Sequence, residues 1–596
     1  MGAGKTDRRN QSEQLELIGE IMERSQKILT EFAKNAGQSS TGGDSPDPLN
    51  LTPIVTELTT RMMANPAAMV QAQLSLWQGY IDLWRNASKR MLGQSTDPVI
   101  EPARDDRRFR DPAWNDDAVF SVIKQSYLLT SRWLTEVMHE VNGLDEKTRQ
   151  KLDFYTRQFV DAIAPSNFVA TNPEVLRATL ESGGDNLLRG LNHLLTDLDR
   201  GKGKLAITMT DADAFEVGGN IASTPGKVVF QNDLMQLIQY SPTTKEVYKT
   251  PLLIIPPWIN KFYILDLQPE NSFVRYAVDK GLTVFVISWV NPGKSHADKS
   301  FEDYMLEGPL TALKAVEQAT GEVQCNAIGY CLGGTLLASL LAYMAEKQDK
   351  RIKSATFFTS LIDFEKPGDL GVFVDEEQLA SMDHMMAEKG YLDGREMSTT
   401  FNMLRANDLI WSFVVNNYLL GKEPFPFDLL YWNADNTRMP YAMHSFYLRE
   451  FYQNNKLIKP GGVTLDGVPI DLTKIRVPAY VLSTREDHIA PWDSTYAATQ
   501  TYRGKNTFVL AGSGHIAGVI NPAGSEKYGY WLNDDLPMDP KDWLEGADQH
   551  EGSWWPNWLS WIRRKSGSKV KARMPGNAGL IAIEDAPGSY VKSRDV

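Results

Sequence analysis

The chain has 596 residues, of which 42 % are apolar, and its formal net charge is −13. This length exceeds what one simple core holds, so two domains are the first expectation. The acidic balance argues against a broad nucleic-acid-binding surface. Two cysteines give no disulfide framework and fit a reducing cytoplasm. No apolar run approaches the roughly 20 residues that span a membrane, and residues 1–6 lack the apolar core of a secretion signal.

The first 200 residues are predicted to be mainly helical. Residues 1–50 combine one helix-like stretch, 12–35, with a segment rich in Gly, Ser, Pro and Asp, 37–48, so we expect a mobile N-terminal segment. Residues 51–200 are predicted to form a helical domain, because apolar residues recur at three- and four-residue spacing in 70–92 and 118–141.

Three aromatic side chains, Trp77, Tyr80 and Trp84, share one face of the first of these helices. We favour the interpretation that this face packs inside its own domain, as amphipathic helices usually do. The alternative is contact with an external apolar surface or a second subunit.

From about residue 201 to 570, predicted strands and helices alternate, which indicates a mostly parallel sheet with crossover helices. The candidate strands are 228–230, 252–255, 283–287, 323–328, 354–359, 479–483 and 507–510.

Cys331 lies between a predicted strand and a predicted helix, in the sequence Gly329-Tyr330-Cys331-Leu332-Gly333. This is the pattern of the nucleophile turn of an α/β-hydrolase, with cysteine in the usual serine position. Gly329 and Gly333 would let strand and helix approach closely. A helix starting after Cys331 would favour the thiolate, and the Leu332 N–H is an expected oxyanion donor. The alternative is a buried cysteine that only fills space, which is the interpretation we give to Cys325.

The alternation of strands and helices stops between about 363 and 455, a stretch rich in Met and aromatic residues that lies where α/β-hydrolases insert lids. We predict a cap over the active site, which would exclude water. An ordinary subdomain core would explain many of the same aromatic residues.

Two later loops supply the partners that this fold requires after the nucleophile. Asp487 follows the predicted strand 479–483, and His515 lies in a glycine-rich loop after 507–510. We predict that His515 is the base and Asp487 the acid that orients it. The rivals are Glu486 for the acid and His488 for the base.

With these residues in hand, the chain is identified as a member of the polyhydroxyalkanoate synthases, and it resembles the single-subunit class that prefers short-chain monomers. The resemblance covers nearly everything from about residue 110 onwards. It is carried by residues 109–115, 256–267, 288–292, 329–334, 407–411, 485–489, 514–522 and 552–556.

The resemblance implies an acyltransferase that polymerises (R)-3-hydroxyacyl-CoA, chiefly (R)-3-hydroxybutyryl-CoA, through a thioester on Cys331. It implies that His515 is the general base, Asp487 the catalytic acid and His488 a supporting residue. The second oxyanion donor is expected in the loop 256–260, at Ile259. No cofactor or metal is expected, because coenzyme A is part of the substrate and leaves. The implied setting is a homodimer in the cytoplasm, associated with polyester granules.

Two other functions remain open at this point. A thioesterase or depolymerase would use the same three residues, although the thiol nucleophile and the long motifs disfavour it. A non-catalytic granule-coating protein would have no use for them. Residues 571–596 are expected to form a C-terminal tail. The basic residues from Arg563 to Arg573 are expected to be solvated, although they could meet coenzyme A phosphates.

Overall fold

The computed structural model describes residues 66–596 except 93, 140, 142, 577–578 and 595–596. The predicted stretch 12–35 and the segment 37–48 therefore lie outside the described residues. The chain divides into two compact units. Of the described residues, one unit takes those up to Asp211 together with Thr400–Phe425, and the other takes those from Ala212 to Thr399 and from Pro426 onwards.

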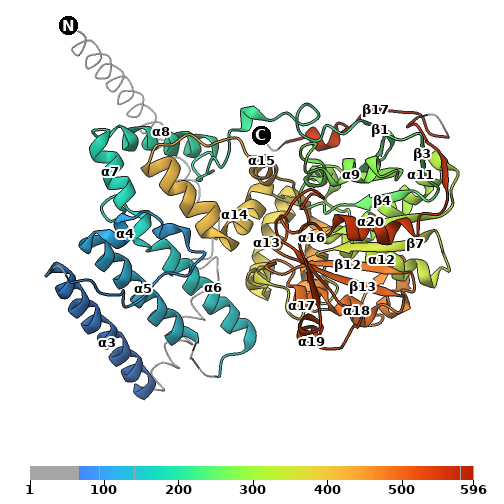
Figure 1. Ribbon diagram of the computed structural model, residues 1–596. Helices are drawn as coiled ribbons and strands as arrows, with labels where there is room; N and C mark the ends of the chain where they lie inside the picture. The colour runs from blue at the N-terminus through green and yellow to red at the C-terminus, as the bar shows by residue number, and fades with distance from the viewer. Residues whose placement is uncertain (1–65, 93, 140, 142, 577–578, 595–596) are drawn as a thin grey trace, which may run out of the picture. The chain divides into compact units, whose positions relative to one another are not determined.

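The first unit is helical, as predicted for residues 51–200 (Figure 1). Its main helices are α3 (Pro66–Met91), α4 (Ala113–Asp116), α5 (Ala118–His139), α6 (Glu146–Ala162), α7 (Pro173–Glu181) and α8 (Asp185–Arg200). The two stretches with helical spacing correspond to α3 and α5.

Only part of the aromatic face of α3 packs inside the unit. Tyr80 bonds through its hydroxyl to Thr130 of α5 at 2.8 Å, and Leu83 beside it is buried. Trp77 and Trp84, in contrast, are 61 % and 68 % exposed. The favoured interpretation is therefore wrong for the two indoles. The apolar face of α3 is wider than the strip that the neighbouring helix α5 covers, so part of that face stays exposed.

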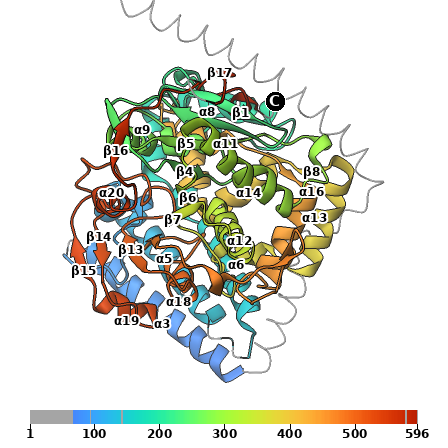
Figure 2. The same ribbon diagram turned by 90° about the vertical axis from the view of Figure 1, so that its right-hand side faces the viewer.

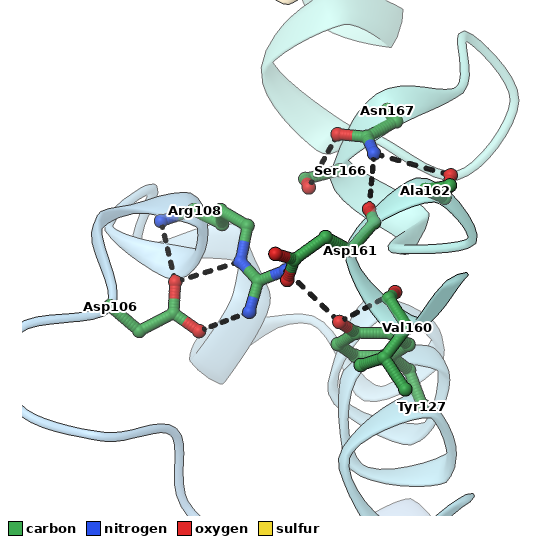
Figure 3. A network of polar contacts seen from close by, with 8 residues as sticks. All are labelled: Asp106, Arg108, Tyr127, Val160, Asp161, Ala162, Ser166 and Asn167. Carbon is green, nitrogen blue, oxygen red and sulfur yellow. Dashed lines mark hydrogen bonds and ion pairs between the residues drawn. The ribbon is translucent and has the colours of Figure 1, made fainter. Parts of the chain in front are cut away.

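A partly buried arginine, Arg108, joins a loop of this unit to two of its helices (Figure 3). Arg108 donates to both carboxylate oxygens of Asp106, at 3.0 and 2.9 Å, and to the hydroxyl of Tyr127 on α5 at 3.0 Å. It also pairs with Asp161 on α6 at 3.2 Å. Because a planar guanidinium can serve several acceptors at once, one side chain joins a loop to two helices.

Residues 400–425 group with the helical unit, so the stretch 363–455 predicted as a cap is not one continuous part of the second unit. The hydroxyl of Tyr418 donates to Asp197 of α8 at 2.6 Å, and Asn186 of α8 donates to the Leu419 carbonyl at 2.8 Å. A Cβ at Gly190 of α8 would overlap the carbonyl of Tyr418. The glycine therefore permits a close backbone approach that the Met and aromatic composition of the stretch could not indicate.

The second unit is organised around an eleven-stranded sheet. In spatial order its strands are β15 (Asp548–His550), β14 (Tyr530–Leu532), β13 (Asn506–Ala511), β12 (Ala479–Thr484), β7 (Ile352–Phe358), β6 (Cys325–Tyr330), β4 (Leu252–Ile255), β5 (Val284–Trp289), β2 (Met235–Tyr240), β1 (Gly226–Gln231) and β17 (Glu584–Asp585).

The six central strands, from β13 to β5, run parallel to one another. The strands outside them pair antiparallel. All seven predicted strands are present in this sheet, and the mostly parallel character is confirmed in its centre.

The sheet separates two apolar cores. Leu253 and Ile255 of β4 face one core, and Leu252 and Ile254 face the other, because successive side chains point to opposite faces of a strand. A strand covered on both faces appears in the sequence as a continuous apolar run.

Figure 2 shows helices on both sides of the sheet. The helices of this unit are α9 (Phe273–Asp279), α10 (Phe301–Met305), α11 (Thr311–Thr320), α12 (Leu332–Glu346), α13 (Glu376–Lys389), α15 (Asp428–Ala434), α16 (Tyr441–Phe446), α17 (Trp492–Thr495), α18 (Ala497–Thr501), α19 (Pro540–Glu545) and α20 (Trp555–Arg563), and α14 (Gly394–Leu404) crosses the boundary between the units.

The C-terminal tryptophans pack back on the sheet. Trp554, Trp555 and Trp558 are fully buried around Phe273 of α9. Each indole removes about 200 Å² from water, which contributes about 5 kcal/mol before entropy is counted. The tail beyond residue 570 is not separate from the domain, because β17 pairs with β1 at the edge of the sheet.

Candidate active site

Cys331 lies at the sharp turn between β6 and α12, with φ 51° and ψ −120°. A positive φ is unusual for a residue with a side chain, and it marks strain that the surrounding structure must hold. The Cys331 N–H donates to the Phe358 carbonyl at 2.9 Å, which fixes the turn to β7. The side chain is partly exposed.

The glycines on either side of the turn are sterically required. A Cβ at Gly329 would overlap the backbone of Gly334, and a Cβ at Gly333 would overlap the carbonyl of Ile255. The start of α12 therefore touches the loop that follows β4. Gly333 has an ordinary φ, so close approach and not backbone freedom explains this glycine.

Asp487 and His515 are brought together from the loops after β12 and β13. The Nδ1 of His515 lies 2.7 Å from Oδ2 of Asp487, and both side chains are buried. Oδ1 of Asp487 accepts from the N–H groups of Ile489 and Ala490 at 2.9 and 2.8 Å. These two bonds fix the carboxylate, and the carboxylate fixes the ring, so Nε2 is the nitrogen left for other chemistry.

The electrostatics of this pair favour the imidazolium. Burial lowers the pKa of His515, but the Asp487 carboxylate and the Cys331 sulfur, which is hydrogen-bonded to the ring, outweigh burial and raise the pKa to about 10. The imidazolium that forms when the ring takes the thiol proton is therefore stabilised.

Tyr330, the residue before the cysteine, supports the histidine. Its hydroxyl donates to the His515 carbonyl at 3.2 Å, and its ring stacks on the imidazole with centroids 5.9 Å apart.

The two alternative residues, Glu486 for the acid and His488 for the base, lie elsewhere or make other contacts. Glu486 is exposed. The carbonyl of His488 accepts the N–H of Asp369 at 2.8 Å, and a Cβ at Gly368 would overlap this carbonyl. Through its backbone, His488 contacts the segment that begins the predicted cap.

The two expected oxyanion donors lie on adjoining segments. Leu332 is the first residue of α12, where N–H groups have no partner inside the helix. Ile259 lies in the loop after β4, and its carbonyl accepts the Thr437 hydroxyl at 2.6 Å. Both segments, together with Asp487 and His515, follow the carboxyl ends of parallel strands, where α/β sheets place their sites.

Two cap tyrosines border the cysteine. Burial raises the pKa of Tyr447 and of Tyr452, and their mutual interaction and the Cys331 sulfur raise it further for Tyr447. For Tyr452, the sulfur is the next cause after burial. Their rings lie 5.5 Å apart, and both contact Phe364.

Tyr452 was not singled out from the sequence. The two tyrosines lie in η10 (Tyr447–Gln453), a π-helical segment, in which residues five apart share a face. The 447/452 spacing does not fit ordinary helical periodicity, so only a π-helical interpretation could have paired them.

The basic residues near the C-terminus lie away from this site. Lys565 is close to Lys505 and Lys353, whose positive charges lower its pKa after burial does. Lys353 and Lys505 stand at the amino ends of β7 and β13, the edge of the sheet opposite the carboxyl ends. The solvated interpretation does not hold for the whole run, because Arg573 pairs with Glu322 at 2.8 Å and Lys569–Lys571 form a strand that pairs with Glu246–Tyr248.

In the described part of the chain, no three His, Cys, Asp or Glu side chains are grouped so as to hold a metal ion. None of the helices described there is long and apolar enough to cross a membrane.

Comparison with known proteins gives the family. A family model described as poly-beta-hydroxybutyrate polymerase (PhaC) N-terminus matches residues 105–277, and an alpha/beta hydrolase fold model matches residues 250–522. A poly(3-hydroxyalkanoate) polymerase of Methylorubrum extorquens is 52 % identical over 91 % of this chain and 90 % of its own length. The chain belongs to the poly(3-hydroxyalkanoate) polymerase family.

Further relatives cover similar lengths. The poly(3-hydroxyalkanoate) polymerase subunit PhaC of Cupriavidus necator is 44 % identical over 89 % of this chain and 89 % of its own, and that of Rhizobium etli is 48 % identical over 92 % and 87 %. The predicted family and the α/β-hydrolase fold class are confirmed. Membership makes the chain an enzyme, a polymerase of the acyltransferase type.

Proposed function

We propose that the chain polymerises (R)-3-hydroxyacyl-CoA, with (R)-3-hydroxybutyryl-CoA as its preferred monomer, through a covalent thioester on Cys331. The observation that carries this proposal is the Asp487–His515 pair, bonded at 2.7 Å beside a cysteine at a strained strand-to-helix turn. The polymerase names of relatives that span nearly the whole chain support it.

The first half-reaction loads the enzyme. Nε2 of His515 takes the Cys331 thiol proton, which the raised pKa of the ring favours. The thiolate attacks the thioester carbonyl, and the oxyanion is stabilised by the N–H groups of Leu332 and Ile259. The carbon–sulfur bond to coenzyme A then breaks, and His515 returns the proton to the leaving thiolate.

The second half-reaction lengthens the chain. The 3-hydroxyl of an acyl group gives its proton to His515 while its oxygen attacks the acyl carbon on Cys331. An ester forms, the bond to Cys331 breaks, and the sulfur recovers the proton. Asp487 holds the imidazole in the tautomer that both halves require.

Sulfur suits this reaction because one thioester is exchanged for another during loading. The acyl group on Cys331 stays activated for attack by a hydroxyl. An ester on a serine would leave the second half-reaction much less driving force.

Water is the competitor that would turn polymer synthesis into thioester hydrolysis. Tyr447, Tyr452 and Phe364 form an aromatic group next to Cys331, and Tyr447 and Phe364 are buried. These side chains support a cap that limits the access of water to the acyl-enzyme.

We further propose that no cofactor is needed and that the enzyme works as a homodimer at the surface of its polyester granule. The exposed indoles of Trp77 and Trp84 support contact with an apolar surface.

The test measures coenzyme A release, polymer and free 3-hydroxybutyrate from hydroxybutyryl-CoA in one reaction. We expect polymer, and labelling of Cys331 by substrate. Cys331→Ala should abolish both, while Cys325→Ala, at a buried site whose burial raises the pKa of the thiol to about 12, should keep both. Free acid as the main product would instead indicate a thioesterase, and activity in Cys331→Ala would exclude the covalent route.

A further inference from the structure

Hydrogen bonds join the backbone of the loop after β4 to the cap segment 432–437, and we call this set of contacts the clamp. Trp432 donates its Nε1–H to the Lys261 carbonyl at 2.7 Å, and the Thr437 hydroxyl donates to the Ile259 carbonyl at 2.6 Å. Between these two bonds, Asn260 and Asn436 form an antiparallel bridge. The Thr437 hydroxyl also lies 2.9 Å from the Trp258 carbonyl, so the chain is held on both sides of the Ile259 N–H.

A buried ion pair lies at the centre of this clamp. Nζ of Lys261 contacts Oδ1 of Asp435 at 2.6 Å, and the two side chains are 4 % and 3 % exposed. The same Nζ donates to the Ser593 carbonyl at 2.8 Å. The hydroxyl of Tyr263 donates to the second carboxylate oxygen of Asp435 at 2.8 Å.

A buried ion pair holds a loop only at a large desolvation cost. Two charges removed from water repay their desolvation only when the geometry is good and the remaining donors and acceptors are satisfied, and an apolar pair often stabilises a fold as well. Here three segments that are far apart in sequence meet at one ammonium group. We therefore expect the main effect of this arrangement to be on the position of the loop and not on the free energy of unfolding.

We propose that Lys261 is a positioning residue: through its ion pair with Asp435 it fixes the loop 256–261 so that the Ile259 N–H points at the oxyanion. This inference rests on the proposed function, because the oxyanion forms only if Cys331 attacks a thioester. Lys261 itself does not touch the reacting atoms in this scheme. Its effect is confined to transition-state stabilisation.

The test compares two reactions of the same sulfur in the full-length protein. Acylation by hydroxybutyryl-CoA passes through an oxyanion, whereas alkylation by iodoacetamide does not. In Lys261→Met we expect kcat for coenzyme A release to fall about 100-fold, as for the loss of one oxyanion donor. We expect KM to change less than threefold and the alkylation rate of Cys331 to stay at the wild-type value.

Lys227→Met is the matched control, since Lys227 pairs with Asp585 at the surface. It should match the wild type in both reactions. Lys261→Met combined with Asp435→Asn leaves no unpaired buried charge, so it keeps the test open if the single variant does not fold. Because the pair acts as one unit, the double variant should lose no more activity than the single one.

Three results would overturn the inference: wild-type kcat in the folded Lys261 variants, equal loss of acylation and alkylation, or a rise in KM at constant kcat. A larger fall in kcat in the double variant than in Lys261→Met alone would also contradict it. If the wild type itself releases no coenzyme A and forms no polymer, the proposed function is refuted. That result is distinct from a refutation of the positioning role of Lys261.

Discussion

Replacing Asp487 with asparagine changes one functional group at constant size. The new Oδ1 can still accept from the N–H groups of Ile489 and Ala490, so the side chain should keep its orientation. The amide NH₂ then occupies the position of the oxygen that lies 2.7 Å from Nδ1 of His515. Nδ1 must accept instead of donate, which places the ring proton on Nε2, facing the sulfur.

The size of the effect follows from the histidine. Its pKa of about 10, against the ordinary 6.5, corresponds to about 5 kcal/mol at 1.36 kcal/mol per unit. Asp487 is the largest of the causes that raise this pKa, so most of that preference is lost with it. Converted to a rate, a loss of about 4 to 5 kcal/mol is a fall of about 10³-fold in kcat.

The assay follows thiol release from hydroxybutyryl-CoA at saturating substrate, with the thermal unfolding midpoint as a check on folding. Glu486→Gln is the matched control, because its carboxylate is adjacent in sequence and exposed. It should keep the wild-type kcat. A folded Asp487→Asn variant with more than a tenth of the wild-type kcat would refute the assignment of Asp487 as the orienting acid.

Three further predictions concern other parts of the molecule. Gly333→Ala should lower the free energy of unfolding by at least about 3 kcal/mol in denaturant titrations, because its Cβ would overlap a carbonyl of the neighbouring loop, whereas Gly293→Ala has open space and should be neutral. Since the folded pKa of His515 lies above its unfolded value, its contribution to stability is complete below about pH 6.5 and is lost as the pH rises through about 10, and a pH series of unfolding midpoints should show a flatter slope in His515→Gln. Replacing Trp77 and Trp84 by serine should leave coenzyme A release unchanged but weaken co-sedimentation with polyester particles, and equal sedimentation would contradict a surface role for these exposed indoles.

The parts of the fold that local sequence determines were predictable. β4 is a run of four apolar residues, so its bounds could be read directly, and the order of Cys331, Asp487 and His515 followed from the fold. The edge strands were not found, because β14, β15 and β17 are three residues long or shorter and partly exposed. Strands of this length carry no periodic signal.

The structure brings Asp487 and His515 together as the sequence order predicted, whereas the contacts that hold loops in place were not predicted. The cap was assigned from its composition, yet residues 400–425 belong to the helical unit because Gly190 lets Tyr418 approach. Likewise, the Lys261–Asp435 contact joins residues 174 positions apart, and neither residue stands in a pattern that names its partner. Pairings across such distances depend on the tertiary structure and leave no local trace.

The return of the C-terminal segment to the sheet has a consequence for how the protein is made. Translation delivers Cys331 and the loop after β4 long before the segment that supplies β17 and the carbonyl of Ser593, the acceptor for Lys261. A nascent chain can therefore form the nucleophile turn while the opposite side of its oxyanion site still lacks a contact. Competence for acyl transfer should therefore come only after the segment around Ser593 has been synthesised.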